Sequence, residues 1–145
     1  MLMNIKINIL ILNWNNKKIL SECIKSIQTS IFTNYKITVV DNGSSDGVID
    51  YICSIYDDIN FIEIDKNLGY AKGYNYAFKI LKNIDDCDWY LLLNNDVILT
   101  KESLSNLIEE KQIYGDNNIY SPKILNYYNN KIWYAGGRIN LFNGN

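Results

Sequence analysis

The sequence IKINILIL, residues 5–12, alternates apolar and polar residues and then becomes continuously apolar. This pattern is typical of a strand that enters a buried sheet. Three more strands are expected at 35–41, 60–64 and 88–93, and the last, DWYLLL, is so apolar that we expect it at the centre of the sheet. Segments with apolar residues at helical spacing separate the four strands. This alternation predicts a three-layer α/β/α domain with a mainly parallel sheet.

The composition is that of one folded domain covering residues 1–145. Hydrophobic residues make up 48% and charged residues 21% of the chain, so disorder is not indicated. The net charge is −2 and the basic residues are scattered, which argues against nucleic acid as a partner. No run approaches the roughly 18 apolar residues of a membrane span, and the N-terminus lacks the layout of a signal peptide. We therefore expect a cytoplasmic protein.

Histidine is absent, which excludes Ser-His-Asp and Cys-His catalysis and every His-ligated metal site. The three cysteines, Cys23, Cys53 and Cys87, are far apart and form no CxxC motif. Such spacing favours reduced, buried thiols over disulfides or zinc. The acidic pairs at 57–58 and 85–86 flank predicted helices and are expected on the solvated surface.

A polar cluster follows each predicted strand: NWNN at 13–16, DNGSSD at 41–46, KNLGYAKGYN at 66–75 and NND at 94–96. Ligands of parallel α/β sheets bind at the carboxyl ends of the strands, so these four loops are expected to form one site. The first loop contains neither a GxGxxG nor a GxxxxGK[ST] motif. This argues against a dinucleotide site of the Rossmann type and excludes a P-loop NTPase.

Trp14 offers a ring for stacking, and Asp41 and Asn42 offer hydrogen-bonding groups at the end of the neighbouring strand. Together they suit a pyrimidine base. The alternative for Trp14 is a hydrophobic residue that covers the sheet, and the alternative for Asp41 is a turn residue that opens its loop. In the same loop, Asp46 has the alternative of an N-cap for the following helix.

Gly69 and Gly73 allow close approach of the backbone at the start of a helix, where Lys72 adds positive charge. Helix N-termini favour phosphate, so this segment is a candidate diphosphate site, and the alternative for GxxxG spacing is helix packing. Asp96 follows the last apolar strand. One carboxylate together with substrate phosphates can bind Mg²⁺ or Mn²⁺, and the alternative is a strand-ending turn.

The order ILNWNN, VVDNGSSDG, NLGYAKGYN, YLLLNNDV and YAGG resembles the family-2 glycosyltransferases, especially their rhamnosyltransferase-like branch. The resemblance covers nearly the whole chain and implies a Rossmann-like GT-A fold. It places NND in the position of the family's DxD motif, with Asp96 as the metal-binding residue. A strict DxD motif would have a carboxylate at Asn94, so this chain keeps one carboxylate of the two.

The resemblance also implies roles for the polar loops. Trp14 and Asn42 would contact the base, and the segment around Gly69 would lie along the ribose and diphosphate. Asn94 and Asn95 would approach the ribose or sugar. The full set of nucleotide-sugar-binding residues implied in this way is Asn13, Trp14, Asn15, Asp41, Asn42, Asn67, Gly69, Lys72, Gly73, Asn94 and Asn95.

Enzymes of this kind transfer a sugar from a UDP-, dTDP- or GDP-sugar in one inverting, metal-assisted displacement. The resemblance therefore predicts a hexosyl- or rhamnosyltransferase that uses Mn²⁺ or Mg²⁺, with a UDP- or dTDP-sugar favoured as donor. The acceptor would be a glycan or a lipid-linked molecule of cell-wall or polysaccharide biosynthesis, with the enzyme cytoplasmic or peripheral at the inner membrane face.

An inverting displacement needs a base, and no carboxylate follows Asp116 in this sequence. We expect the base and the acceptor half beyond Asn145, so residues 1–145 are expected to form an incomplete, C-terminally truncated donor-binding domain. Apolar surface left uncovered by the missing half would favour a homodimer.

Two other functions stay open. The first is a degenerate, non-catalytic module that acts as an interaction or assembly subunit, favoured by an aromatic hairpin expected around Asn129 and Asn130. The second is a sugar nucleotidylyltransferase, a class expected to carry a Gly-rich, basic loop after the first strand. The NWNN loop is neither Gly-rich nor basic.

Overall fold

The computed structural model describes residues 5–115 and 118–136, and the chain divides into two compact units between Lys101 and Glu102. In the first unit the elements are β1 (Ile7–Asn13), α1 (Lys17–Gln28), β2 (Tyr35–Asp41), α2 (Val48–Cys53), β3 (Ile59–Glu63), α3 (Tyr70–Leu81) and β4 (Trp89–Asn94). In the second unit they are α4 (Ser103–Tyr114), β5 (Ile124–Leu125) and β6 (Ile132–Tyr134).

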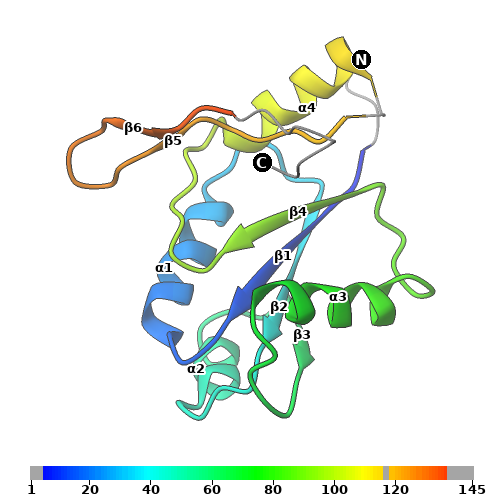
Figure 1. Cartoon of the computed structure of the whole chain (residues 1–145), viewed down its shortest axis with the longest axis vertical. Coiled ribbons are helices and arrows are strands. Elements are labelled where there is room, and N and C mark those ends of the chain that lie inside the picture. The colour runs from blue at the N-terminus through cyan, green and yellow to red at the C-terminus, as the bar shows by residue number, and fades with distance from the viewer. Residues whose placement is uncertain (1–4, 116–117, 137–145) are drawn as a thin grey trace, which may run out of the picture. The chain divides into compact units, whose positions relative to one another are not determined.

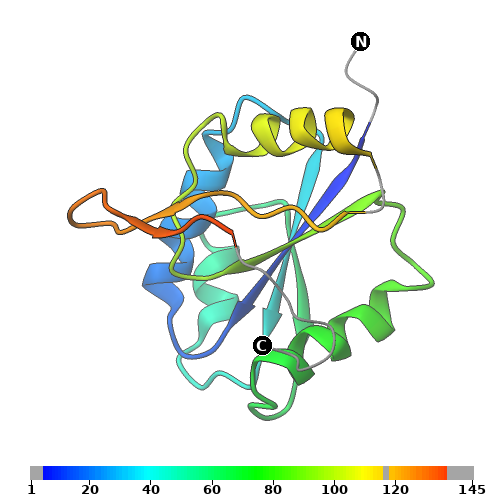
Figure 2. The ribbon, with the colours of Figure 1, turned by 45° about the horizontal axis from the view of Figure 1, so that its top comes forward.

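The strands of the first unit form a parallel sheet in the order β3-β2-β1-β4 (Figure 1). Helices α1 and α2 lie on one face of this sheet and α3 lies on the other (Figure 1, Figure 2). On the α3 side, alternate strand residues form a core cluster with the buried face of the helix, made of Leu10, Val40, Ile62, Ile64, Tyr74, Ala77 and Leu81. The predicted three-layer α/β/α class is confirmed.

The prediction that the strand at 88–93 is central is wrong, because β1 occupies the centre and β4 is an edge strand of this sheet in the described part of the chain. β1 pairs with β2 on one side and β4 on the other, and nearly all of its residues are buried. In β4, Leu92 remains 43% exposed. A strand's composition reports its hydrophobicity but not how many neighbours it pairs with.

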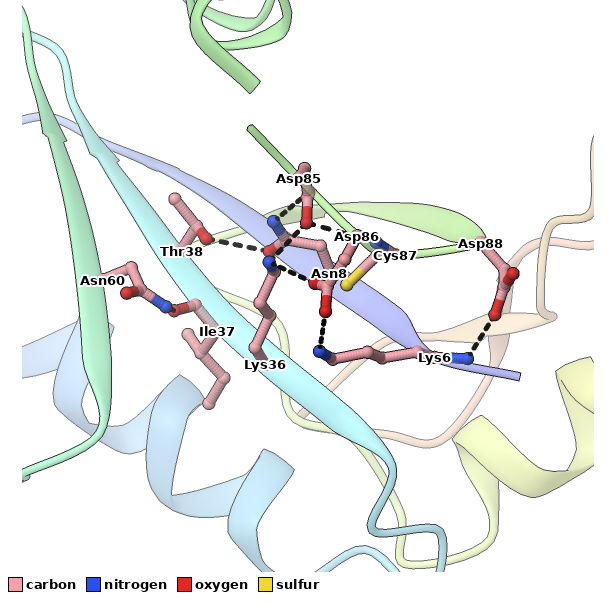
Figure 3. A network of polar contacts seen from close by, with 10 residues as sticks. All are labelled: Lys6, Asn8, Lys36, Ile37, Thr38, Asn60, Asp85, Asp86, Cys87 and Asp88. Carbon is pink, nitrogen blue, oxygen red and sulfur yellow. Dashed lines mark hydrogen bonds and ion pairs between the residues drawn. The ribbon is translucent and has the colours of Figure 1, made fainter. Parts of the chain in front are cut away.

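A polar network joins the strands at their amino ends (Figure 3). Asn8 is fully buried in β1; its Nδ2 donates to Oδ2 of Asp85 over 2.7 Å, and its Oδ1 accepts from Oγ1 of Thr38 over 2.8 Å. Lys36 Nζ forms ion pairs with Asp85 and Asp86. The Asp85 side chain is 0% exposed, so the prediction of a solvated Asp85 is wrong, whereas Asp86 is 68% exposed as predicted.

The charges of this network stabilise each other. Burial raises the pKa of Asp85, but hydrogen bonds with Asn8, Lys36 and Tyr90 outweigh burial and hold that pKa well below its usual range. Burial lowers the pKa of Lys36, and its hydrogen bonds with Asp85 and Asp86 raise it by more, so the net shift is upward. Both partners are therefore ionised at neutral pH, and they fix the segment between α3 and β4 to β1 and β2.

The second unit contains the predicted hairpin. β5 and β6 are antiparallel, and the backbone N–H of Asn126 donates to the carbonyl of Lys131 over 2.8 Å. Asn130 adopts a φ of 56°, a left-handed conformation that asparagine tolerates. The hairpin leaves Tyr128 92% and Trp133 74% exposed. In the described residues, no helix is long and apolar enough to cross a membrane.

Candidate functional site

A cleft of about 270 Å³ opens at the carboxyl edge of the sheet in the first unit, where β1 and β4 end and α3 begins. It is lined by Leu12, Asn13, Trp14, Asn16, Tyr70, Asn94, Asn95 and Asp96. The structure thus brings together the predicted loops at 13–16 and 94–96, and it adds the first residue of α3. These loops approach each other because parallel strands end at the same edge.

Two aromatic rings flank this cleft. Trp14 is 52% exposed and Tyr70 is 58% exposed, and both line the cleft. Trp14 is therefore not a buried residue that covers the sheet. Tyr70 and Asn16 were not predicted as site residues, although both lie inside the predicted polar loops at 66–75 and 13–16. The signal for Tyr70 was its place directly after Gly69, at the start of the helix.

Asp96 lies in the turn after β4, with its side chain exposed and lining the cleft. Within the described part of the chain, no hydrogen bond or ion pair engages its carboxylate. A strand-ending turn residue would use its carboxylate to bond the local backbone. The structure therefore leaves the Asp96 oxygens available to a ligand.

The oxygen atoms at this turn suit a hard divalent cation that is also coordinated by a bound phosphate ligand. Asp96 supplies one carboxylate, and Asn94 supplies an exposed amide beside it. Asn95 turns its Nδ2 inward to Oδ1 of Asn13 over 2.7 Å, which fixes the turn against β1. Mg²⁺ and Mn²⁺ accept oxygen ligands and commonly complete their coordination with water and substrate phosphates. These residues suit such an ion, and the absence of thiolate and imidazole at the cleft does not suit zinc.

Another group with metal-ligating atoms, Asp85, Asp86 and Cys87, lies at the opposite, amino edge of the sheet. Its carboxylates already form ion pairs with Lys36 and Lys6. Burial and the neighbouring Asp85 raise the pKa of Cys87 to about 11, so its thiol is protonated at neutral pH. Two ammonium groups at contact distance repel a further cation, and we assign no metal to this group.

Asp41 and Asn42 shape the loops beside the cleft and do not line it. Oδ1 of Asp41 accepts hydrogen bonds from the backbone N–H and the hydroxyl of Ser44, so Asp41 stabilises the turn that opens its loop. Asn42 is 2% exposed; its Oδ1 accepts from the N–H of Leu68 over 2.9 Å, and its Nδ2 donates to Oδ1 of Asn67 over 3.0 Å. Contact of either side chain with a base stays a prediction.

Asn15 and Asp46 connect the first two loops. The N–H of Asn15 donates to Oγ of Ser44 over 2.9 Å, and its Oδ1 accepts from the N–H of Ser45 over 2.7 Å. Oδ2 of Asp46 accepts from the N–H of Lys17, the first residue of α1, over 3.1 Å. Asp46 thus serves the start of α1 and not the helix that follows it in the sequence. These contacts hold Trp14 at the mouth of the cleft.

The glycine segment divides into parts with different surroundings. Gly69 is the N-cap of α3, with a φ of +80° and open space where a Cβ would lie. Its N–H donates to Oδ1 of Asn67 over 2.8 Å, and its carbonyl accepts from the N–H of Gly73 over 3.0 Å. A Cβ at Gly73 would lie 2.7 Å from Cδ1 of Leu12, which makes Gly73 a packing residue between α3 and β1. Lys72 is exposed and lines a separate groove on α3, not the cleft.

Cys23 lies beneath the turn that carries Asp96. It is fully buried, and its Sγ donates to the carbonyl of Asn94 over 3.7 Å. Burial raises the pKa of this thiol to about 12, and the charge of Asp96 also raises it, while a backbone hydrogen bond at Val97 lowers it. Cys23 is a neutral packing residue and no nucleophile.

Replacing Gly43 with alanine is expected to lower the free energy of unfolding by about 2 kcal/mol. Gly43 has a φ of +78°, and an added Cβ would lie 2.6 Å from backbone atoms of Lys66, so the loop at 66–69 would have to move. Gly47→Ala is the matched control because Gly47 has a φ of +69° and no atom within 4 Å of the added Cβ. The control should lose only about 1 kcal/mol in urea denaturation, and equal losses would show that the close approach is unimportant.

Comparison with known proteins gives the same assignment as the sequence motifs. The family described as Glycosyl transferase family 2 matches residues 8–143. The low-salt glycan biosynthesis hexosyltransferase Agl10 of Haloferax volcanii is 32% identical over 122 residues, which cover 83% of this chain and 37% of the relative. The chain therefore spans little more than a third of the length of this curated relative.

Solved structures share the fold at low identity. The mannosyltransferase PcManGT from Pyrobaculum calidifontis, in complex with GDP-Man and Mn²⁺, has a TM-score of 0.65 and 15% identity, covering 73% of this chain and 32% of that one. S. aureus TarS 1-349 in complex with UDP-GlcNAc has a TM-score of 0.66 and 19% identity, covering 82% and 37%. Both confirm the predicted GT-A-like fold. With the family match over residues 8–143, this chain belongs to family 2 of the glycosyl transferases.

Proposed function

We propose that the first unit binds the nucleoside diphosphate part of a nucleotide sugar in the carboxyl-edge cleft, together with Mn²⁺ or Mg²⁺ on Asp96. The observation that carries this proposal is an exposed carboxylate that has no bonding partner among the described residues and lies in a cleft between two aromatic rings. The chain would thus carry the donor-binding part of an inverting, metal-assisted glycosyltransferase that acts on a glycan or lipid-linked acceptor. Its expected setting is cell-wall or polysaccharide biosynthesis on the cytoplasmic side of the membrane.

The chemistry of each group supports this assignment. The rings of Trp14 and Tyr70 provide flat apolar surfaces against which a base or a sugar can stack. The exposed amide of Asn94 can exchange hydrogen bonds with hydroxyl groups of a ribose or a sugar. The N-terminus of α3, which begins at Tyr70, carries partial positive charge that favours a phosphate group. A metal bound at Asp96 would neutralise charge that develops on the leaving diphosphate.

The catalytic base is not among the groups that line the cleft. Asp96 is the only carboxylate among the described residues at the cleft, and a carboxylate that holds a metal is not free to accept the proton of an acceptor hydroxyl. We therefore assign donor binding to this cleft and assign the base to none of its residues.

The proposal is tested by calorimetric titration of UDP, dTDP and GDP, each with and without Mn²⁺. The relatives solved with GDP-Man and with UDP-GlcNAc support including both purine and pyrimidine nucleotides. Binding of at least one diphosphate that Mn²⁺ strengthens is the expected result, and the preferred base identifies the class of donor. Absence of binding for all three nucleotides would overturn the proposal.

The exposed aromatic hairpin favours a second candidate function. Tyr127 is 77% exposed and Trp133 is 74% exposed, and such surfaces often mark protein contacts. In this alternative the chain is a non-catalytic interaction or assembly subunit, and the same surface would support a homodimer. Sedimentation velocity, which gives the oligomeric state, and the nucleotide titration together distinguish the two functions. A stable dimer that binds no nucleotide favours the subunit role, and a monomer that binds nucleotide favours the donor site.

A further inference from the structure

A groove of about 570 Å³ lies along α3 and is lined by Lys72, Lys79 and Lys82. The three lysines follow each other at intervals of seven and three residues, which places them on one stripe of the helix over roughly 15 Å. Tyr76 lies between them on the same stripe, and Phe78 also lines the groove. We call this surface the α3 groove.

The α3 groove carries unbalanced positive charge. No acidic residue lines it, and the sequence contains no acidic residue from Lys66 to Ile84. In the part of the chain that the structure describes, no ion pair includes Lys72, Lys79 or Lys82. The whole chain has a net charge of −2, so this face is opposite in sign to the average of the molecule. The groove is therefore complementary to an anionic partner.

Apolar side chains accompany the lysines. Leu68, Tyr76 and Phe78 line the groove together with the lysines, and Tyr76 is 40% exposed. Lysines with long apolar stems beside aromatic and aliphatic side chains are typical of surfaces at the boundary between lipid headgroups and acyl chains. A soluble polyanion would use the ammonium groups but would gain nothing from these apolar side chains.

We propose that the α3 groove docks this protein on a membrane surface that contains anionic phospholipids. The lysine ammonium groups would pair with lipid phosphates, while Tyr76 would lie at the level of the headgroups. Because Tyr70 at the start of α3 lines the cleft, docking on α3 would bring the cleft close to the membrane. The inference does not depend on the proposed donor site, since it rests on Lys79 and Lys82, which line the groove and not the cleft.

The test is co-sedimentation of the full chain with phosphatidylcholine vesicles, with and without phosphatidylglycerol. The expected result is at least about tenfold stronger binding to the anionic vesicles, with most of the difference lost between about 0.05 and 0.5 M salt. The double variant K79E/K82E should bind the anionic vesicles at least about tenfold more weakly than the unmodified chain does. Equal binding to both kinds of vesicle would overturn the proposal.

The matched control is K18E/K25E on α1, which lies on the opposite face of the sheet and mixes its lysines with Glu22 (Figure 1). This control changes the net charge by the same amount as K79E/K82E. Each of the two variants replaces one lysine in the last turn of its helix, Lys25 in α1 and Lys79 in α3. Circular dichroism and urea denaturation show whether each variant is folded. If the control loses as much vesicle binding as K79E/K82E, net charge and not the α3 groove is responsible. If polyphosphate binds the groove as tightly as vesicles do, a soluble polyanion is the partner and the membrane proposal fails.

Discussion

Asp96→Ala is expected to weaken Mn²⁺-dependent nucleotide diphosphate binding about 100-fold, equivalent to about 2.7 kcal/mol. Asp96 supplies the one carboxylate that lines the cleft in the described part of the chain, and it has no internal bond to lose on substitution. The fold should therefore keep its stability while the metal site is removed. Calorimetric titration of the nucleotide with and without Mn²⁺ measures the effect.

The control for this substitution is Asp57→Ala. Asp57 is exposed in the loop between α2 and β3 and does not line the cleft. Its substitution removes the same negative charge as Asp96→Ala. Residual binding in the absence of Mn²⁺ should be similar in both variants and in the unmodified chain, because stacking on Trp14 does not need the metal. If Asp96→Ala retains the full Mn²⁺ effect, the metal is not at Asp96.

Asp85→Ala is expected to lower the free energy of unfolding at pH 7 by about 3 kcal/mol. The substitution leaves Nδ2 of Asn8, which is fully buried, without its acceptor, and it removes one partner of Lys36. It also releases the segment between α3 and β4 from the amino ends of β1 and β2 (Figure 3). Urea denaturation of the two proteins at the same pH gives the difference.

The loss should depend on pH in a defined direction. The pKa of Asp85 is lower in the folded state than its ordinary value of 3.8, so its contribution is complete above that value and decreases as the pH falls toward the folded-state pKa. The Lys36 contribution is present up to its ordinary pKa of 10.5, because its pKa is raised on folding. The stability difference between the two proteins should thus be constant near neutral pH and smaller at pH values below about 4.

Asp86→Ala is the matched control for Asp85→Ala. Asp86 also pairs with Lys36, but its side chain is 68% exposed. Water replaces an exposed partner at little cost, so this variant should lose much less stability. Equal losses for the two variants would mean that the buried hydrogen bond to Asn8 contributes little.

The sequence predicted the strands and the polar edge of the sheet well because both follow from local patterns. The strand YKITVVD was expected at 35–41 and occupies those residues, because β-branched residues end at a turn-forming Asp41. The convergence of loops 13–16 and 94–96 followed from parallel topology alone. The family resemblance added the expectation that Asp96 binds metal, and no residue that the structure describes bonds its carboxylate.

The remaining features depend on contacts between distant residues, which local patterns do not report. Asp41 and Asn42 were predicted to bind a ligand, and the sequence did not show that Asp41 also bonds Ser44 in its own loop or that Asn42 bonds Leu68 in the next loop. Asp85 was predicted to be a surface residue, but it bonds the buried side chain of Asn8, which lies 77 residues earlier in the chain. DWYLLL was predicted to be a central strand, but its position at the sheet edge depends on which strands pair.

The most direct test of the metal and donor site is a crystal structure with Mn²⁺ and the diphosphate that binds best, with the ion located by its anomalous scattering. We expect one Mn²⁺ in direct contact with the Asp96 carboxylate and the diphosphate, with the base beside Trp14 or Tyr70. An ion at Asp85 and Asp86, or a nucleotide bound away from the cleft, would show that the proposed site is wrong.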